Sequence, residues 1–79
     1  MMEKKRVFLT RTLHDFALKE LKKIYEIEIH SGKIPIPKTK LLSKIKDIDG
    51  LICFPYDKID RYIIENAKNL KIISTYSVG

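Results

Sequence analysis

The side chains best suited to chemistry are two histidines, His14 and His30, and one cysteine, Cys53. His14 precedes Asp15 at the start of a helical stretch, which favours a capping or solvated role over catalysis. His30 ends an alternating stretch on its polar side, which predicts exposure at the surface. No third group is placed to orient either histidine as an acid or base, and Cys53 has no paired metal ligand nearby. We therefore expect no catalytic residue in this chain and a buried strand position for Cys53.

Motifs for cofactors and metals are missing from the sequence. A dinucleotide fingerprint needs closely spaced glycines between a strand and a helix, whereas Gly32, Gly50 and Gly79 lie far apart. Asp47 and Asp49 flank the end of a predicted helix without further acids at calcium-loop spacing, so turn chemistry explains them better than a metal site. We expect this chain to bind no cofactor and no metal ion.

Strands and helices are expected to alternate along the sequence. Period-two or wholly apolar runs predict strands at residues 6–10, 26–30, 51–54 and 71–76. The first helix is expected at 14–25, with a stripe made of Ala17, Leu21, Ile24 and Tyr25.

Two further helices complete the pattern. Apolar residues at helical spacing predict one helix from Leu41 to Ile48, ended by Gly50, and another after Asp57, which is placed to cap it. Residues 31–37 contain Pro35 and Pro37 and are expected to form an exposed connection.

The order βαβαβαβ predicts an α/β fold, a doubly wound sheet of about four parallel strands with helices on both faces. In such sheets ligands bind beyond the carboxyl ends of the strands. Function is therefore expected in the loops at 10–12, 31–33, 55–57 and 76–79, which include the aromatic residues Tyr56 and Tyr76. Tyr25 and Tyr62 occupy helical positions and are expected at the core or its rim.

Composition limits the possible partners and locations. A hydrophobic fraction of 44% argues against disorder, and the chain is long enough for one small domain. The net charge of +6 raises the possibility of nucleic-acid binding, but lysines interleaved with acids along the chain favour solvated helix faces. No apolar run could cross a bilayer and no secretory signal is present, so we expect a cytoplasmic protein. Abundant Ile, Lys and Glu fit a thermophilic source.

Several segments together resemble a known family. They are VFLTR in the first strand, KIKDIDGLICF, DKIDRYIIENAKNLKIIS and the terminal TYSVG. In this order they are similar to the N-terminal part of the substrate-binding, or catalytic, domain of D-isomer-specific 2-hydroxyacid dehydrogenases. The resemblance is strongest to glyoxylate or hydroxypyruvate reductases and phosphoglycerate dehydrogenases, and it covers residues 6–79.

The resemblance implies a flavodoxin-like domain of which residues 1–79 form a single incomplete part. It implies substrate binding by Val78 and Gly79 through backbone N–H groups, with Pro55 and Tyr56 bordering the substrate. The family's nucleotide-binding domain, which holds NAD or NADP, and its catalytic residues lie beyond Gly79. The chain alone is therefore expected to catalyse no hydride transfer, and its uncovered apolar surface is expected to promote self-association or a homo-oligomer.

The resulting hypothesis is the substrate-side part of an enzyme that reduces a small 2-oxo acid such as glyoxylate or hydroxypyruvate. One alternative is a stand-alone flavodoxin-like interaction or regulatory module. The other is a small basic nucleic-acid-binding domain, which the dispersed charges disfavour.

Overall fold

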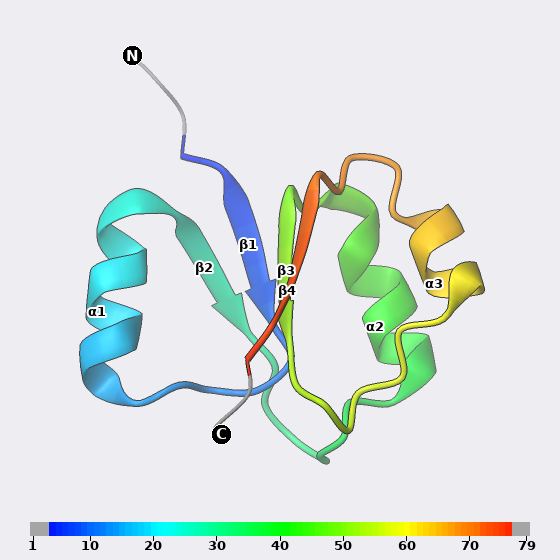
Figure 1. Cartoon of the computed structure of the whole chain (residues 1–79), viewed down its shortest axis with the longest axis horizontal. Coiled ribbons are helices and arrows are strands. Elements are labelled where there is room, and N and C mark those ends of the chain that lie inside the picture. The colour runs from blue at the N-terminus through cyan, green and yellow to red at the C-terminus, as the bar shows by residue number, and fades with distance from the viewer. Residues whose placement is uncertain (1–3, 77–79) are drawn as a thin grey trace.

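A single four-stranded sheet organises the chain, of which the computed structural model describes residues 4–76. Its strands are β1 (Arg6–Leu9), β2 (Glu26–Ile29), β3 (Gly50–Cys53) and β4 (Ile72–Thr75). All pair in parallel in the order β2-β1-β3-β4, so β2 lies at one edge and β4 at the other (Figure 1). The predicted α/β fold with a parallel sheet is confirmed, as is the edge position of the second strand.

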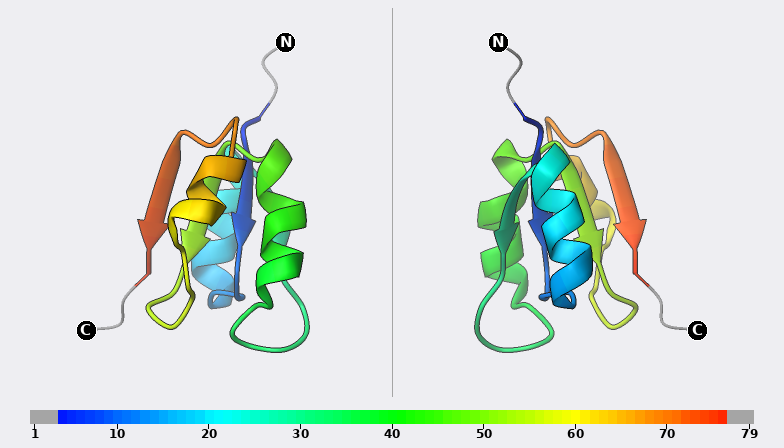
Figure 2. Two further views of the ribbon diagram at one scale, coloured as in Figure 1. Left: turned by 90° about the vertical axis from the view of Figure 1, so that its right-hand side faces the viewer. Right: turned by 90° about the vertical axis from the view of Figure 1, so that its left-hand side faces the viewer.

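Helices cover the two faces of the sheet unequally. They are α1 (Asp15–Ile24), α2 (Lys38–Lys44), continued by the 3-10 turn η1 (Ile45–Asp47), and α3 (Arg61–Asn66). Helix α1 lies on one face, whereas α2 and α3 lie on the other (Figures 1 and 2). Right-handed crossovers require this division, because the chain moves one way from β1 to β2 and the opposite way for its later strands.

The core consists of two layers separated by the sheet. Side chains alternate along β1, so Val7 and Leu9 pack toward α1 while Phe8 packs toward α2 and α3. Phe8 and Leu9 are completely buried. Burying each such side chain contributes about 1.5–3 kcal/mol. The sequence expectation that Cys53 is a buried strand residue is also confirmed, since it is 3% exposed.

In the apolar stripe of α1, Leu18 takes the place that was predicted for Ile24. Ala17, Leu18, Leu21 and Tyr25 are partly buried against the strands, which confirms the prediction that Tyr25 lies at the core or its rim. Ile24 is 62% exposed, so its assignment to the stripe was wrong. The centre of the packed stripe falls between Leu21 and Tyr25, and Ile24 lies at its margin.

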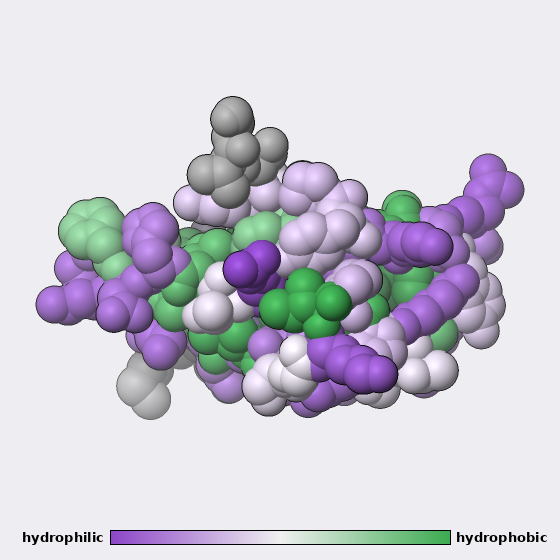
Figure 3. Space-filling view, turned by 90° about the horizontal axis from the view of Figure 1, so that it is seen from below, coloured by the Kyte–Doolittle hydropathy of each residue, from purple (hydrophilic) through white to green (hydrophobic). Residues whose placement is uncertain are grey.

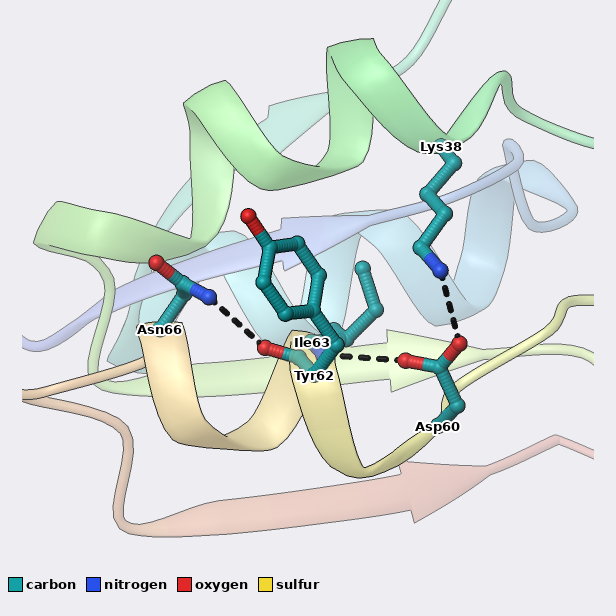
Figure 4. Close-up of polar contacts among 5 residues, drawn as sticks. All are labelled: Lys38, Asp60, Tyr62, Ile63 and Asn66. Carbon is teal, nitrogen blue, oxygen red and sulfur yellow. Dashed lines mark hydrogen bonds and ion pairs between the residues drawn. The ribbon is translucent and has the colours of Figure 1, made fainter.

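Helix α3 is capped by Asp60, so the prediction that Asp57 caps it was wrong. One oxygen of Asp60, Oδ1, accepts the Ile63 N–H at 3.0 Å, and the other pairs with Lys38 Nζ at 2.8 Å (Figure 4). Lys38 also lies 5.4 Å from the ring centre of Tyr62, which is itself exposed rather than in the core. Asp57 is engaged elsewhere, as described below, and is unavailable for capping.

Gly50 opens β3 and does not end the preceding helix, which corrects a second prediction. It lies in register with Val7 on one side and Ile72 on the other. A Cβ atom here would come within 3.3 Å of Val7 Cγ2 and 3.4 Å of Ile72 Cγ2. Close packing between three strands, rather than a helix end, therefore explains this glycine.

The connection between β2 and α2 is mostly exposed, as predicted, with one exception. Ile36 is 8% exposed and joins the core layer beneath α2 and α3. It anchors an otherwise solvent-facing segment that contains Pro35 and Pro37.

Two adjacent isoleucines of α3 provide a matched test of this packing. Ile63 is completely buried, whereas Ile64 is 51% exposed. We expect Ile63→Ala to lower the free energy of unfolding by about 2–5 kcal/mol, because it leaves a cavity in the core. Ile64→Ala should change it by less than about 0.5 kcal/mol. Urea denaturation checks both, and equal effects would contradict the assigned orientation of α3.

A pH dependence follows from Asp60. Hydrogen bonds from Lys38 and then from the Ile63 N–H hold the pKa of this carboxyl below its ordinary value of 3.8. Because the folded-state pKa is lowered, the stabilisation is present above 3.8 and is lost as the pH falls through the folded-state pKa. Asp60→Asn keeps a capping oxygen but removes the charge. We expect its thermal midpoint to fall below that of the wild type at neutral pH and to converge with it in acid.

Candidate functional site

The loops that follow β1, β3 and β4 meet at the carboxyl edge of the sheet. Figure 3 views the molecule from this side, where hydrophilic residues surround scattered hydrophobic ones. The loops enclose a hollow of about 460 Å³. Its lining consists of Arg11, Thr12, Leu13, His14, Phe54, Pro55, Tyr56 and Tyr76. The structure thus brings the predicted residues Pro55 and Tyr56 together with Tyr76.

Phe54 lies at the centre of an aromatic group beside the hollow. Its ring is stacked on that of Tyr56, with centroids 5.9 Å apart, and is tilted against that of Tyr76 at 5.6 Å. Phe54 is 8% exposed, whereas Tyr56 is 40% exposed. A rigid apolar base with one accessible tyrosine edge therefore borders the hollow.

Arg11 contributes positive charge to the same place. Its Nη1 donates a hydrogen bond to the Tyr56 hydroxyl at 3.0 Å. The guanidinium carbon also lies 6.0 Å from the centre of the Phe54 ring, within reach of a cation–π interaction. The remaining guanidinium N–H groups can serve an anionic ligand.

Asp57 closes the turn that carries Pro55 and Tyr56. Its backbone N–H donates to the Phe54 carbonyl at 2.9 Å, and its Oδ2 accepts the Phe54 N–H at 2.8 Å. The same oxygen accepts a hydrogen bond from the Thr10 hydroxyl. Thr10 is 1% exposed and its N–H donates to the Ile52 carbonyl at 3.1 Å, so the turn is tied to the end of β1.

The prediction for one histidine is confirmed and that for the other is wrong. His14 caps α1, because its Nδ1 accepts the Ala17 N–H at 3.4 Å, and this confirms the predicted role. His30 is only 7% exposed, so the prediction of a surface position was wrong. Its Nε2 donates to the Lys33 carbonyl at 2.7 Å, and Gly32, at φ +123°, lies against the ring. The chain after β2 folds back over His30, which the period-two pattern could not indicate.

Asp49, one of the two acidic residues considered for a metal site, binds the backbone at the start of β1 instead. Asp49 Oδ2 accepts the Arg6 N–H at 2.8 Å, which confirms a structural role. Across residues 4–76, His, Cys, Asp and Glu side chains form no group of three that could hold a metal ion. In the same part of the chain, no helix has the length and apolarity to cross a membrane.

Two predicted substrate-binding residues, Val78 and Gly79, lie outside the described residues. Conversely, sequence reasoning had not assigned functional roles to Arg11, Thr10 and Asp57. All three lie in loops that were expected to face ligands, so the rule for doubly wound sheets identified the region but not the side chains.

A second hollow lies on the α1 side of the sheet, away from the carboxyl-end loops. It measures about 370 Å³ and is bordered mainly by apolar residues of β1, β3, β4 and α1, including Val7, Leu21, Ile52 and Ile72. The hollow is present because α1 covers this face of the sheet only in part.

Sequence and structure comparisons place this geometry in a family. Residues 7–79 match the family described as the D-isomer specific 2-hydroxyacid dehydrogenase, catalytic domain. The chain belongs to this family. The match covers the whole sheet and the loops at its carboxyl edge, and it confirms the resemblance inferred from the sequence.

Individual proteins show the same extent of similarity. Glyoxylate reductase of Thermococcus litoralis is 40% identical over 76 residues, which are 96% of this chain and 23% of that enzyme. Structures from Pyrococcus horikoshii and Thermus thermophilus superpose with TM-scores of 0.84 and 0.83, at 35% and 43% identity. The aligned regions cover 98% and 94% of this chain but only 22% and 24% of those two proteins. The chain thus spans about a quarter of the relatives that it matches.

Proposed function

We propose that this chain forms the substrate-side part of a nicotinamide-dependent 2-hydroxyacid dehydrogenase that reduces a small 2-oxo acid such as glyoxylate or hydroxypyruvate. The observation that carries the proposal is the hollow at the carboxyl edge, bordered by Tyr56 and Arg11. Ligands bind at this edge in doubly wound sheets. The similarity to glyoxylate reductases supports the class of substrate.

The residues of the hollow suit an anionic substrate of this size. Arg11 attracts a carboxylate toward the edge, and the Phe54 ring excludes water from its base. Pro55 and Tyr56 border the substrate in this proposal. Backbone N–H groups of Val78 and Gly79 would bind its carboxylate, as backbone nests do without a charged side chain.

The nicotinamide cofactor does not fit the described residues. A pyrophosphate needs a glycine-rich turn between a strand and a helix, but residues 10–14, between β1 and α1, all carry side chains. Gly32 lies against the His30 ring, and Gly50 packs between strands. We therefore assign NAD or NADP, and the transfer of hydride, to another part of a longer protein.

Several lysines lie beside acidic residues, which does not favour the nucleic-acid alternative. Ion pairs join Lys23 to Glu20, Lys38 to Asp60 and Lys44 to Glu28 on the surface. These pairs interleave basic and acidic residues on solvated faces, whereas the Lys and Arg side chains of a nucleic-acid site cluster on one face.

Strand β4 supports the expectation of self-association. Ile72 is 67% exposed and Ile73 is 37% exposed, on an edge with one unpaired side. We infer that residues 1–79, when separated from the rest of a longer protein, associate through this edge.

Substitution of Tyr56 tests the proposed site in the full-length enzyme. Tyr56→Ala removes the ring edge beside the substrate and the partner of Arg11, and we expect the KM for glyoxylate to rise about tenfold. The KM for the nicotinamide cofactor should stay within about twofold. Steady-state kinetics check both constants.

Tyr62→Ala is the matched control, because Tyr62 is exposed on α3 and lies outside the lining of the hollow. Its kinetics should equal those of the wild type. An unchanged KM in Tyr56→Ala would refute the placement of the substrate beside this residue.

A further inference from the structure

We propose that Thr10 and Asp57 are positioning residues, which set the location of Pro55 and Tyr56 without touching the substrate themselves. The inference deepens the proposed function and rests on it, since it requires the turn at residues 54–57 to face the 2-oxo acid. It adds two residues that determine substrate affinity through the geometry of that turn.

The turn is closed by hydrogen bonds at both ends. The backbone N–H of Asp57 donates to the Phe54 carbonyl at 2.9 Å, which makes residues 54–57 a β-turn with Pro55 at its second position. In the other direction, the Phe54 N–H donates to Asp57 Oδ2 at 2.8 Å. These two bonds shape the turn but do not locate it relative to the sheet.

Thr10 supplies the missing attachment. Its hydroxyl donates to the same Oδ2 atom, which thereby joins the turn to the end of β1 across 47 positions of sequence. Thr10 is almost completely buried, and its N–H is held by the Ile52 carbonyl. The sheet therefore fixes the position of the Thr10 hydroxyl, and this hydroxyl fixes the position of the Asp57 carboxylate.

The contacts of the Asp57 carboxylate suit it to hold the turn in place. Its second oxygen, Oδ1, is buried without a hydrogen-bond partner among the described residues. A charged acceptor makes the two bonds to Oδ2 shorter and stronger than a neutral group would.

Arg11, which follows Thr10 in the chain, contacts the other side of the turn. Arg11 donates to the Tyr56 hydroxyl at 3.0 Å, while Phe54 stacks against the Tyr56 ring. Consecutive residues at the end of β1 thus determine both the backbone of the turn and the direction of its tyrosine. Loss of the Thr10 hydroxyl should release the backbone and displace Tyr56 from the hollow.

The test compares Thr10→Val with Thr10→Ser in the full-length protein. Valine keeps the volume and branching of threonine but removes the donor, whereas serine keeps the donor. We expect Thr10→Val to raise the KM for glyoxylate about tenfold, with kcat and the cofactor KM within about twofold of the wild type. Thr10→Ser should restore the wild-type KM.

Ser43→Ala is the control for removal of a hydroxyl group. Ser43 lies on α2 and donates to the Lys40 carbonyl at 2.7 Å, far in the fold from the turn. Its kinetics should be those of the wild type. If Thr10→Val does not fold, Asp57→Asn serves instead, because a neutral amide weakens the acceptor and should raise the KM with the cofactor KM unchanged.

Amide hydrogen exchange of residues 50–60 gives a readout that does not depend on activity. Exchange at Phe54 and Asp57 should be faster in Thr10→Val and unchanged in Thr10→Ser and Ser43→Ala. Normal exchange in Thr10→Val, or faster exchange with an unaltered KM, would overturn the positioning role. A wild-type protein that reduces no 2-oxo acid would instead overturn the proposed function, and the two failures are therefore distinguishable.

Discussion

Strand β1 is paired on both edges and buried on both faces, and the remaining elements are arranged around it. Backbone bonds link it to β2 and β3, while Val7 and Leu9 pack toward α1 and Phe8 toward α2 and α3. A central parallel strand demands helical crossovers on either side. Once this strand is in place, the carboxyl ends of all four strands must lie at one edge.

The chemistry available at that edge depends on how β1 ends. Thr10 and Arg11 follow the strand directly and contact Asp57 and Tyr56 in the loop after β3. The end of the central strand therefore shapes a loop carried by its neighbour, and Phe54 fills the space between them. A rigid scaffold positions short loops here, which is how parallel sheets can carry many specificities on one fold.

The sequence predicted the elements because their signals are local. Apolar runs and helical stripes identified all four strands and the three helices, and the rule for doubly wound sheets directed attention to the loops at the carboxyl edge. The errors arose where tertiary contacts override local patterns. Aspartate is a common helix cap, but the carboxylate of Asp57 accepts hydrogen bonds from the Thr10 hydroxyl and the Phe54 N–H. Asp60 caps α3 instead.

His30 and Gly50 illustrate the same limit. Alternation placed His30 on a polar side, yet the turn around Gly32 folds over its ring. Gly50 resembles a helix terminator, although its role is to let Val7 and Ile72 approach from neighbouring strands. The partners of Gly50 are far from it in sequence, as Tyr56 is from Arg11, whereas those of His30 are near but follow the end of the alternating pattern.

The long separation between Thr10 and Asp57 bears on the order in which the domain assembles. Their contact closes a segment of 47 positions that includes two helices and two strands. The entropy of closing so long a segment must be offset before the contact forms, although the cost grows only slowly, by about 0.6 kcal/mol for each doubling of length. The hydrogen bonds of helices α1 and α2 are local, whereas the shape of the loop that borders the hollow depends on the pairing of β3 with β1. The shape of the carboxyl edge therefore depends on contacts between segments far apart in the sequence, even though its first residues are among the earliest in the chain.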